Sequence, residues 1–242
     1  MRILLVGYGK MGRTIESLAG EFGCEVAGFI DPPSPGGTDG PQSDRWSGVD
    51  VAIDFSTPES VVKNVPVLAG RGISVVIGTT GWQKDEAAIR RAVADTSVGV
   101  VAAPNFSTGV ILFEAVVAKA AALFSTHSEF GAWLNEAHHR TKKDAPSGTA
   151  LMLKRAMEGA GYKRPIDVTS IRAGSIPGVH TVGFDGPADT ITLTHTARDR
   201  SAFARGALLA ATWVNGKRGW FNMHDVLGLD KVDWRETSEF RK

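Results

Sequence analysis

A glycine-rich turn near the N-terminus constrains the fold more than any other part of the chain. The segment RILLVGYGKMGRTIESLAG passes from an apolar run through GxGxxG into a helical pattern of apolar residues. A GxGxxG motif that follows a strand and opens a helix has the context of a dinucleotide-binding fold. In that context Gly7 makes the tight turn, Gly9 lets a pyrophosphate approach, and Gly12 permits close helix–strand packing. A glycine-rich turn without a ligand is the alternative.

An acidic residue ends the second apolar segment. CEVAGFID stops at Asp31, about twenty residues after the glycines, where a carboxylate accepts hydrogen bonds from the adenosine ribose. An acid there repels the 2′-phosphate of NADP, and Pro32 and Pro33 supply no cation, although Lys10 or Arg13 could. We therefore expect NADH to be favoured, with NADPH not excluded. The alternative role for Asp31 is to initiate a turn before proline.

Further strand–helix units follow. Residues 32–48 are rich in Pro, Gly and Ser and predict a surface loop. VDVAIDFS predicts a strand, and Ser56-Thr57-Pro58-Glu59 supplies a hydroxyl cap, a first-turn proline and an acid for a helix start. Two more strands end in Gly78-Thr79-Thr80-Gly81 and Ala103-Pro104-Asn105-Phe106. Because nucleotides bind at the carboxyl edge of a parallel sheet, this half predicts an α/β, Rossmann-type domain.

The strand–helix alternation stops after a long helix predicted at 108–124. After the polar segment at 136–150 and the helix that it opens, three β-rich runs follow without helices between them, at 167–173, 179–184 and 190–197, before a helix at 201–214. This order predicts a second, α+β domain with a mixed or antiparallel sheet. We expect residues 1–107 and 200–242 to form the dinucleotide-binding domain, and residues 108–199 to form the domain for substrate binding and oligomerisation.

The densest polar segment is EAHHRTKKDAPSGTA, residues 136–150. It spans the end of a predicted strand, a loop, and a helix that opens at Gly148 and Thr149. Free N–H groups and the positive end of the helix dipole attract an anion there, and a glycine allows close approach. The segment's histidines, lysines and hydroxyl groups add further donors, so it predicts a pocket for a small molecule carrying one or more carboxylates.

This segment resembles the signature of the dihydrodipicolinate reductase family, also called 4-hydroxy-tetrahydrodipicolinate reductase. The matching residues are Glu136, His138, Lys142, Asp144, Pro146, Ser147, Gly148, Thr149 and Ala150, whereas Trp133 stands where the family pattern has Glu. That difference bears on strand packing more than on chemistry. Further similarity lies in the segments around residues 172–180 and 200–204 and in GWFNMHDVLGL, so the resemblance touches nearly the whole chain.

The resemblance implies hydride transfer from NAD(P)H to a cyclic unsaturated imine dicarboxylate, giving tetrahydrodipicolinate in lysine and diaminopimelate biosynthesis. It also implies a homotetramer joined through the second domain. Lys142 is the expected proton donor, His138 an acid–base or polarising group, and His139 a substrate contact, while Gly148 and Thr149 hold a carboxylate. The expected cofactor-binding residues are Gly7, Tyr8, Gly9, Lys10, Met11, Gly12, Asp31, Gly78, Thr79, Thr80, Ala103, Pro104, Asn105 and Phe106, and the two later turns serve the nicotinamide half.

The expected reaction places particular demands on this segment. Hydride arrival at C4 of a conjugated imine pushes charge onto the ring nitrogen and C3, so a nearby cation stabilises the transition state. Arg140 and Lys143 would favour release of the Lys142 proton. If the strand continued past His138, the rings of His138 and His139 would point to opposite sides.

Several alternatives stay open from the residues. A histidine pair is often a polar strand end, Lys143 is equally a solvated charge, and the role of Arg200 is undetermined. A zinc site is not expected, because Glu136 and the two histidines lack ligand spacing and no thiols are available. The chain could also be an inactive dinucleotide-binding sensor or scaffold, or a related amino-acid or semialdehyde dehydrogenase; the intact DAPSGTA and the lone Cys24 argue against a dehydrogenase that needs a different cysteine.

The composition excludes several other classes of protein. The 242 residues are 43% hydrophobic, enough for a sizeable core, and 27 Lys and Arg against 26 Asp and Glu exclude the basic field of a nucleic-acid-binding protein. A single cysteine rules out an intrachain disulfide. The N-terminal apolar run is too short for a signal-peptide core, and Glu114 and Lys119 interrupt the longest apolar stretch, so we expect no membrane partner and a cytoplasmic location.

Overall fold

The computed structural model describes residues 1–31 and 39–229 and divides the chain into two compact units. The first unit comprises Met1–Ser107 and the chain from Phe203 onward, and the second comprises Thr108–Ala202. The second boundary lies three residues after the predicted one, inside a continuous helix. Residues 32–38 of the predicted loop, with Pro32 and Pro33, and the final residues of the predicted dinucleotide domain lie outside the described residues.

The first unit is built on a six-stranded sheet in the order β10-β5-β4-β3-β1-β2. All neighbouring strands are parallel, which confirms the predicted Rossmann-type sheet. Its strands are β1 (Arg2–Val6), β2 (Glu25–Ile30), β3 (Val51–Asp54), β4 (Ser74–Ile77), β5 (Gly99–Ala102) and β10 (Gly219–Phe221). The sequence did not predict β10, a three-residue strand that pairs with β5 from far along the chain.

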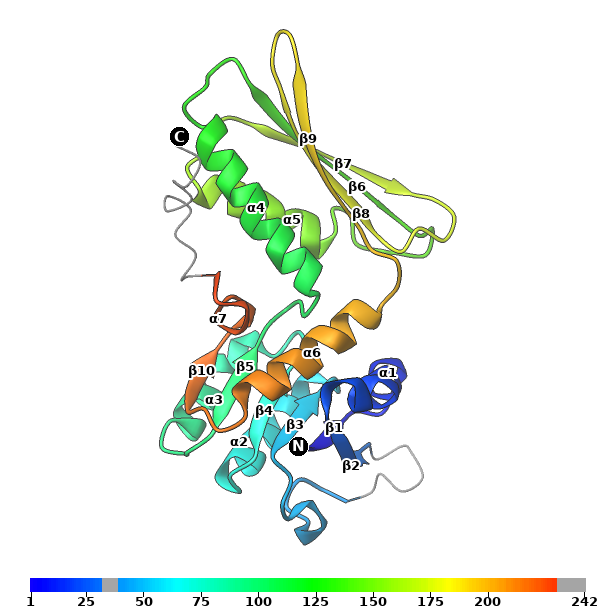
Figure 1. The fold of residues 1–242 in the computed structure, drawn as a ribbon, viewed down its shortest axis with the longest axis vertical. Helices are drawn as coiled ribbons and strands as arrows, with labels where there is room; N and C mark the ends of the chain where they lie inside the picture. Colours follow the sequence, from blue (N-terminus) through cyan, green and yellow to red (C-terminus); the bar gives the residue numbers. More distant parts are fainter. Residues whose placement is uncertain (32–38, 230–242) are drawn as a thin grey trace, which may run out of the picture. The chain divides into compact units, whose positions relative to one another are not determined.

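Helices cover both faces of this sheet (Figure 1). They are α1 (Lys10–Ala19), α2 (Pro58–Gly70), α3 (Glu86–Val93), α6 (Ser201–Val214) and α7 (Met223–Leu227), with 3-10 turns η1 (Gly20–Phe22), η2 (Asp44–Trp46) and η3 (Gln83–Asp85). Val61 and Val65 of α2 and Ile89 of α3 pack in one core with side chains from the central strands. Helix α2 begins as predicted, because Thr57 caps it by accepting from Ser60 N at 3.3 Å.

The second unit has a four-stranded sheet in the order β7-β6-β8-β9. Its elements are α4 (Thr108–Phe124), β6 (Gly131–His138), α5 (Gly148–Gly159), β7 (Ile166–Arg172), β8 (Val179–Asp185) and β9 (Thr190–Thr196). β6 and β7 are parallel and the other pairs antiparallel, which confirms the predicted mixed sheet. Helices α4 and α5 lie on one face of this sheet (Figure 1).

The two faces of the second sheet differ in chemistry. Leu134, Phe184 and Leu153 belong to the buried core under the helices. Because side chains alternate along a strand, Trp133 and Asn135 point to the other, open face. Trp133 lies across Gly183 there: a Cβ at Gly183 would stand 2.2 Å from its Cε2 atom. The departure from the family pattern at Trp133 therefore affects the open face and not the helix-covered one.

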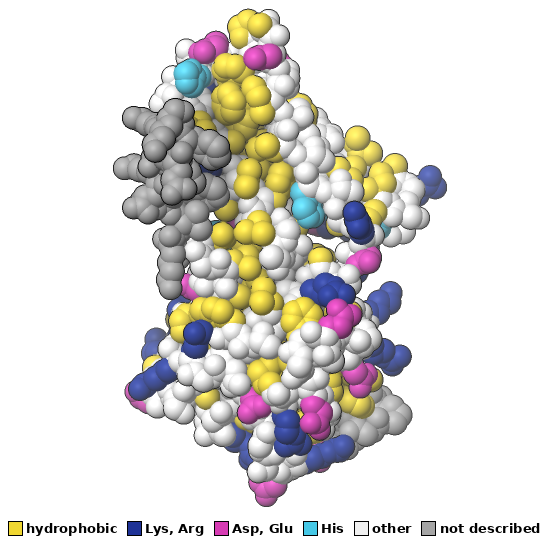
Figure 2. Space-filling model, in the orientation of Figure 1, with side chains coloured by type: hydrophobic (Ala, Val, Ile, Leu, Met, Phe, Trp, Pro, Cys, Tyr) yellow, Lys and Arg dark blue, Asp and Glu magenta, His cyan; other side chains and the backbone are white. Residues whose placement is uncertain are grey.

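Helix α4 carries several exposed apolar side chains. Leu112, Val116 and Leu123 are 44%, 43% and 61% exposed, and Figure 2 shows apolar atoms along this helix. Within the described part of the chain, no helix combines the length and the hydropathy needed to cross a membrane.

Candidate active site

The N-terminal glycine turn has the geometry that the sequence predicts. Gly7 has φ +89°, and a Cβ there would stand 2.3 Å from the Phe55 carbonyl oxygen. A Cβ at Gly12 would stand 2.4 Å from the Gly7 carbonyl oxygen, so α1 approaches β1 as closely as expected. Around the Cβ position of Gly9, by contrast, the described residues place no heavy atom within 4 Å. Gly7 and Gly12 thus serve packing, while Gly9 leaves the helix opening accessible to a phosphate.

A stack of side chains flanks this turn. The rings of Tyr8 and Phe29 lie 4.0 Å apart and nearly parallel, and the Arg13 guanidinium lies 5.5 Å from the Tyr8 ring centroid. Asp31 follows β2 directly and is half-buried, and Lys10 and Met11 lie in the first turn of α1. Phe29 has no role predicted from the sequence; its position two residues before Asp31 is the signal that could have indicated one.

Phe55 lies between the two other predicted cofactor turns, those at Gly78 and at Phe106. A Cβ at Gly78 would stand 2.2 Å from its Cζ atom, and the rings of Phe55 and Phe106 lie 6.0 Å apart. Gly78 and Phe106 therefore lie against the ring of Phe55, and Gly7 lies against its backbone carbonyl group. Sequence reasoning missed this aromatic residue. The signal for it is an aromatic residue placed directly after an apolar strand.

A buried acid lies at the same strand end. Asp54 is fully buried, and its Oδ1 accepts from Ser56 N, Ser56 Oγ and Thr79 Oγ1 at 3.0, 2.7 and 2.7 Å. Its Oδ2 is buried and has no hydrogen-bond partner among the described residues. Burial raises the pKa of Asp54 despite these donors. The Thr79 hydroxyl is thus used inside the protein, which leaves backbone groups and Thr80 of that turn for a ligand.

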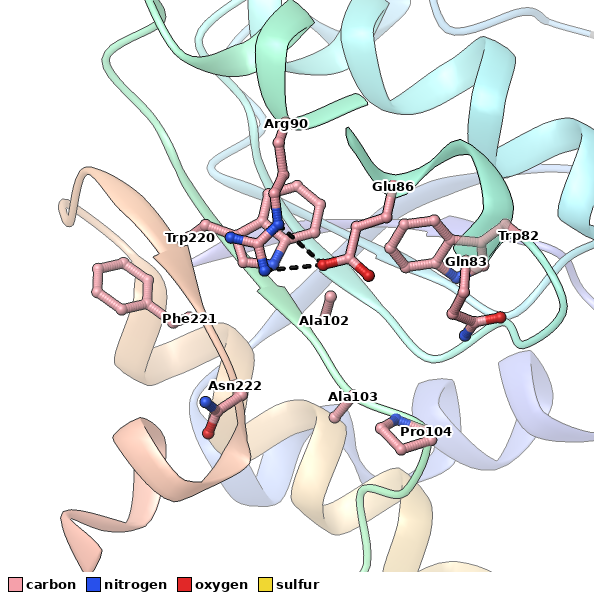
Figure 3. Close-up of a pocket in the computed structure, with 10 residues that line it drawn as sticks. All are labelled: Trp82, Gln83, Glu86, Arg90, Ala102, Ala103, Pro104, Trp220, Phe221 and Asn222. Carbon is pink, nitrogen blue, oxygen red and sulfur yellow. Dashed lines mark hydrogen bonds and ion pairs between the residues drawn. The ribbon is translucent and has the colours of Figure 1, made fainter. Parts of the chain in front are cut away.

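A pocket of about 450 Å³ opens at the carboxyl ends of β4, β5 and β10 (Figure 3). It brings the predicted Ala103 and Pro104 together with side chains from distant segments. On its wall, Arg90 pairs with Glu86 at 2.7 Å and lies 4.4 Å from the Trp220 ring centroid. Its lining comprises Trp82, Gln83, Glu86, Arg90, Ala102, Ala103, Pro104, Trp220, Phe221 and Asn222. Sequence reasoning missed this pocket because it depends on the placement of β10.

The second unit gathers the rest of the predicted site at the end of β6. The strand ends at His138, so His139 lies in the loop, where its Nδ1 is 2.8 Å from Thr141 Oγ1. Lys142 Nζ donates to both oxygens of Asp144, at 2.8 and 3.0 Å. In the structure, the ion-pair partner of Lys142 is thus a carboxylate two residues away.

The opening of α5 holds this same carboxylate. Ser147 caps the helix by accepting from Ala150 N at 3.2 Å, and α5 begins at Gly148 as predicted. Hydrogen bonds from Lys142 and from the Gly148 backbone contribute to a lowered pKa of Asp144, and the Lys142 hydrogen bond is the largest cause. Lys142, the predicted proton donor, and Gly148, predicted to hold a substrate carboxylate, thus share a carboxylate of the loop.

Beneath the loop lies a buried polar cluster on the helix-covered face. The rings of His138 and His180 meet edge to face, 5.1 Å apart, and His180 Nε2 lies 3.1 Å from Ser147 Oγ. Burial, followed by the nearby His138, lowers the pKa of His180 to about 4, so this ring is neutral at pH 7. Glu136 is fully buried beside them and pairs with Arg172 at 2.7 Å. His180 and Arg172 have no role predicted from the sequence, although both lie in the segment around residues 172–180 that carries the family resemblance.

Glu136, His138 and His180 also place three potential metal-ligand atoms within 4.8 Å of one another. The Arg172 guanidinium already contacts both oxygens of Glu136, at 3.0 and 2.7 Å. Because a cation would have to displace this guanidinium to use the carboxylate, the arrangement favours an internal ion pair over a metal centre.

Comparison with known proteins decides the family. Residues 1–106 match the model for the N-terminus of dihydrodipicolinate reductase, and residues 109–227 match the model for its C-terminus. The chain belongs to the dihydrodipicolinate reductase family. A 4-hydroxy-tetrahydrodipicolinate reductase of Rhodopseudomonas palustris is 36% identical over 96% of this chain and 99% of its own length. The reductase of Methanoregula boonei is 37% identical over 93% of this chain and 96% of its own length.

A solved structure agrees at the level of the fold. Dipicolinate-bound dihydrodipicolinate reductase from a Paenisporosarcina species has a TM-score of 0.76, with 21% identity over 92% of this chain and 97% of that one. The family resemblance seen in the sequence is therefore confirmed. Membership of a family of NAD(P)H-dependent reductases also supports the enzyme interpretation over an inactive sensor or an amino-acid dehydrogenase.

Proposed function

We propose that this chain transfers a hydride from NAD(P)H to 4-hydroxy-tetrahydrodipicolinate, whose 4-hydroxyl group leaves as water, or to the form that has already lost this water, giving tetrahydrodipicolinate for lysine and diaminopimelate biosynthesis. The observation that carries the proposal is the Asp144 carboxylate held by Lys142 and the opening of α5. A substrate carboxylate presents the same chemical group to the same donors. We place the reaction in the cytoplasm, as the sequence predicts.

In this reaction Lys142 supplies the proton and orients one end of the ring dicarboxylate. A substrate carboxylate takes over the Lys142 and Gly148 donors from Asp144, and Thr149 and His139 add contacts at the same helix opening. Burial lowers the pKa of His138, so at pH 7 its neutral ring can accept a proton or polarise the substrate. When bound, the nicotinamide supplies the hydride.

The first unit fits a dinucleotide through residues of this chain. The open approach at Gly9 suits the pyrophosphate, Asp31 suits the adenosine ribose, and the turns at Gly78–Thr80 and Ala103–Phe106 suit the nicotinamide half. We propose NADH as the favoured cofactor because Asp31 repels a 2′-phosphate. Arg13, exposed beside Tyr8, is the group that would allow NADPH.

Substitution of Lys142 tests the proton donor. Lys142→Ala should lower kcat by about 10²- to 10⁴-fold while leaving NADH affinity nearly unchanged, because general acid catalysis typically contributes that much. Lys163→Ala is the matched control, since Lys163 is an exposed lysine of the same unit outside this loop. Full activity in the Lys142 variant, or an equal loss of turnover and NADH binding, would contradict the role of Lys142 as proton donor.

The substrate and the cofactor are tested together. Absorbance of NADH is followed after addition of freshly prepared condensation product of pyruvate and aspartate semialdehyde, and the assay is repeated with NADPH. We expect oxidation with both cofactors and a higher kcat/KM with NADH. No oxidation above the blank contradicts the reductase proposal, and a strong preference for NADPH contradicts the role given to Asp31.

We further propose a homotetramer assembled through the open face of the second sheet. One row across this face carries Thr169, Asn135, Thr181 and Thr194, joined side by side by hydrogen bonds of 2.7 Å (Asn135 to Thr169) and 3.0 Å (Thr181 to Thr194). The short, uncharged side chains of this row permit close pairing with a second copy. Thr181→Arg should therefore separate the copies and lower the molecular mass measured by light scattering. Ser128→Arg, in an exposed turn, is the control and should leave the mass unchanged. An unchanged mass for Thr181→Arg would contradict the proposed interface.

A further inference from the structure

A fully buried carboxylate joins three segments of the second unit. Glu136, on β6, accepts from both terminal nitrogens of Arg172 on β7, at 3.0 and 2.7 Å. Its Oε1 also accepts from Ser147 N, at the opening of α5, at 3.3 Å. Its Oε2 contacts Nδ1 of His138, two residues along the same strand. Arg172 in turn donates to the Asp144 carbonyl oxygen at 2.6 Å, so the pair also anchors the loop.

Glu136 is charged in this setting. Burial alone would favour the neutral acid, but the Arg172 guanidinium, with further hydrogen bonds from Ser170 and His138, lowers the pKa of Glu136 to about 2. The same carboxylate raises the pKa of Arg172. An ionised carboxylate only accepts hydrogen bonds, so the proton between Glu136 and His138 belongs to Nδ1 of the imidazole.

The other side of the His138 ring faces a glycine. A Cβ at Gly178 would stand 3.2 Å from His138 Nε2, and Gly178 has φ +150°. A side chain at that position would crowd Nε2. Since Nδ1 carries the proton of the neutral ring, Nε2 presents a lone pair on the side that Gly178 leaves free.

We propose that Glu136, held by Arg172, is a positioning residue that fixes His138 in the Nδ1–H tautomer with Nε2 directed toward the reacting ring. This inference rests on the proposed reductase function and adds to it a residue that touches neither the substrate nor the cofactor. A carboxylate that accepts from one ring nitrogen sets both the tautomer and the orientation of a histidine. Arg172 keeps the carboxylate charged and limits its rotation through two parallel hydrogen bonds.

Glu136→Gln tests the proposal, with Glu158→Gln on the exposed side of α5 as the matched control. A Gln amide can donate to Nδ1, which stabilises the Nε2–H tautomer instead. The variant should lower kcat by about 10- to 100-fold, the usual effect of losing a group that orients a functional histidine. Affinities for NADH and for pyridine-2,6-dicarboxylate, used as a substrate-shaped probe, should stay within about threefold, because Ser147 still caps α5.

The direct readout is the tautomer of His138, measured by long-range 1H–15N NMR with 15N-labelled histidine. With six histidines in the chain, the His138 signals are assigned by their loss in His138→Gln. We expect Nδ1–H in the wild type and in Glu158→Gln, and Nε2–H in Glu136→Gln. This measurement needs no substrate, so it stands even if the wild type fails to oxidise NADH and the proposed function falls.

Two results would overturn the proposal. One is an unchanged His138 tautomer in Glu136→Gln with kcat within twofold of the wild type. The other is a parallel loss of kcat, NADH affinity and probe affinity, which marks a merely structural role. If Glu136→Gln does not fold, the same measurements are made on Glu136→Gln/Arg172→Gln, which leaves no unpaired buried charge.

Discussion

At the scale of single residues, two buried acids, one in each unit, have pKa values shifted in opposite directions. Asp54 and Glu136 are both fully buried at or near the end of a strand. Asp54 is hydrogen-bonded only by neutral donors among the described residues, and burial raises its pKa, whereas a guanidinium keeps Glu136 ionised. The identity of the neighbour therefore decides the charge, and this identity is a tertiary property.

His180 should make the protein sensitive to mild acid. Its pKa is about 4 in the folded chain against 6.5 for the ordinary group, so below pH 6.5 the unfolded chain binds a proton that the folded chain does not. Stability should fall as pH drops from about 6.5 to about 4, by up to roughly 3 kcal/mol from this group. Urea unfolding at several pH values should show a flatter profile for His180→Gln, whereas His127→Gln, at an exposed site, should follow the wild type. Identical profiles for wild type and His180→Gln would contradict the prediction.

Asp54 should have the opposite effect on the pH dependence of stability. Because its folded pKa is raised, the folded chain holds its proton more tightly, and stability falls as pH rises from the unfolded value of 3.8 through the folded one. Asp54→Asn keeps an acceptor for Ser56 and Thr79 but carries no charge. The variant should raise the melting temperature at pH 8 by a few degrees and have a smaller effect at pH 4. A lower melting temperature at pH 8 would mean that Asp54 is stabilised by a contact other than those described.

At the scale of elements, α6 shows how a helix can be predicted while its packing is not. The helix occupies Ser201–Val214 as the pattern predicted. A Cβ at Gly206, however, would stand 1.6 Å from the Phe106 carbonyl oxygen, so the helix lies directly on a predicted cofactor turn. Helical periodicity carries no information about this approach, because periodicity concerns faces and not distances.

Gly206→Ala should therefore destabilise the protein, although alanine is the better helix former. The added methyl group forces the helix away from the Phe106 backbone, which should cost about 3 kcal/mol or more. Gly159→Ala, at the end of α5 with no described heavy atom within 4 Å of its Cβ position, is the control and should be nearly neutral. Chemical denaturation measures both. A neutral Gly206→Ala would show that α6 moves aside freely.

At the scale of the whole molecule, the chain forms two units with separate buried cores. Since the proposed cofactor residues lie in the first unit and the proposed substrate residues in the second, each ligand alone should stabilise one unit. Hydrogen exchange should show NADH protecting β1, β4 and β5, and pyridine-2,6-dicarboxylate protecting β6 and the start of α5. Equal protection of both units by NADH alone would contradict this division.

The sequence by itself determined the local features and the family. These local features depend on residues within a few positions of one another. They are the GxGxxG turn, the capped start of α2, the bounds of α4 and α6, and the opening of α5 at Gly148. Backbone conformation and amphipathic period are encoded at this range, so they could be predicted without coordinates. The signature around Lys142 then indicated the chemistry.

Only the tertiary structure decided which distant groups meet. β10 joins β5 and completes a pocket, Phe55 fills the space between the glycine turns, and Arg172 neutralises Glu136 beneath His138. The charge state of a buried group and the space beside a glycine depend on atoms brought by other strands and helices. No pattern along the chain carries these quantities, because they arise when separate segments are packed against one another.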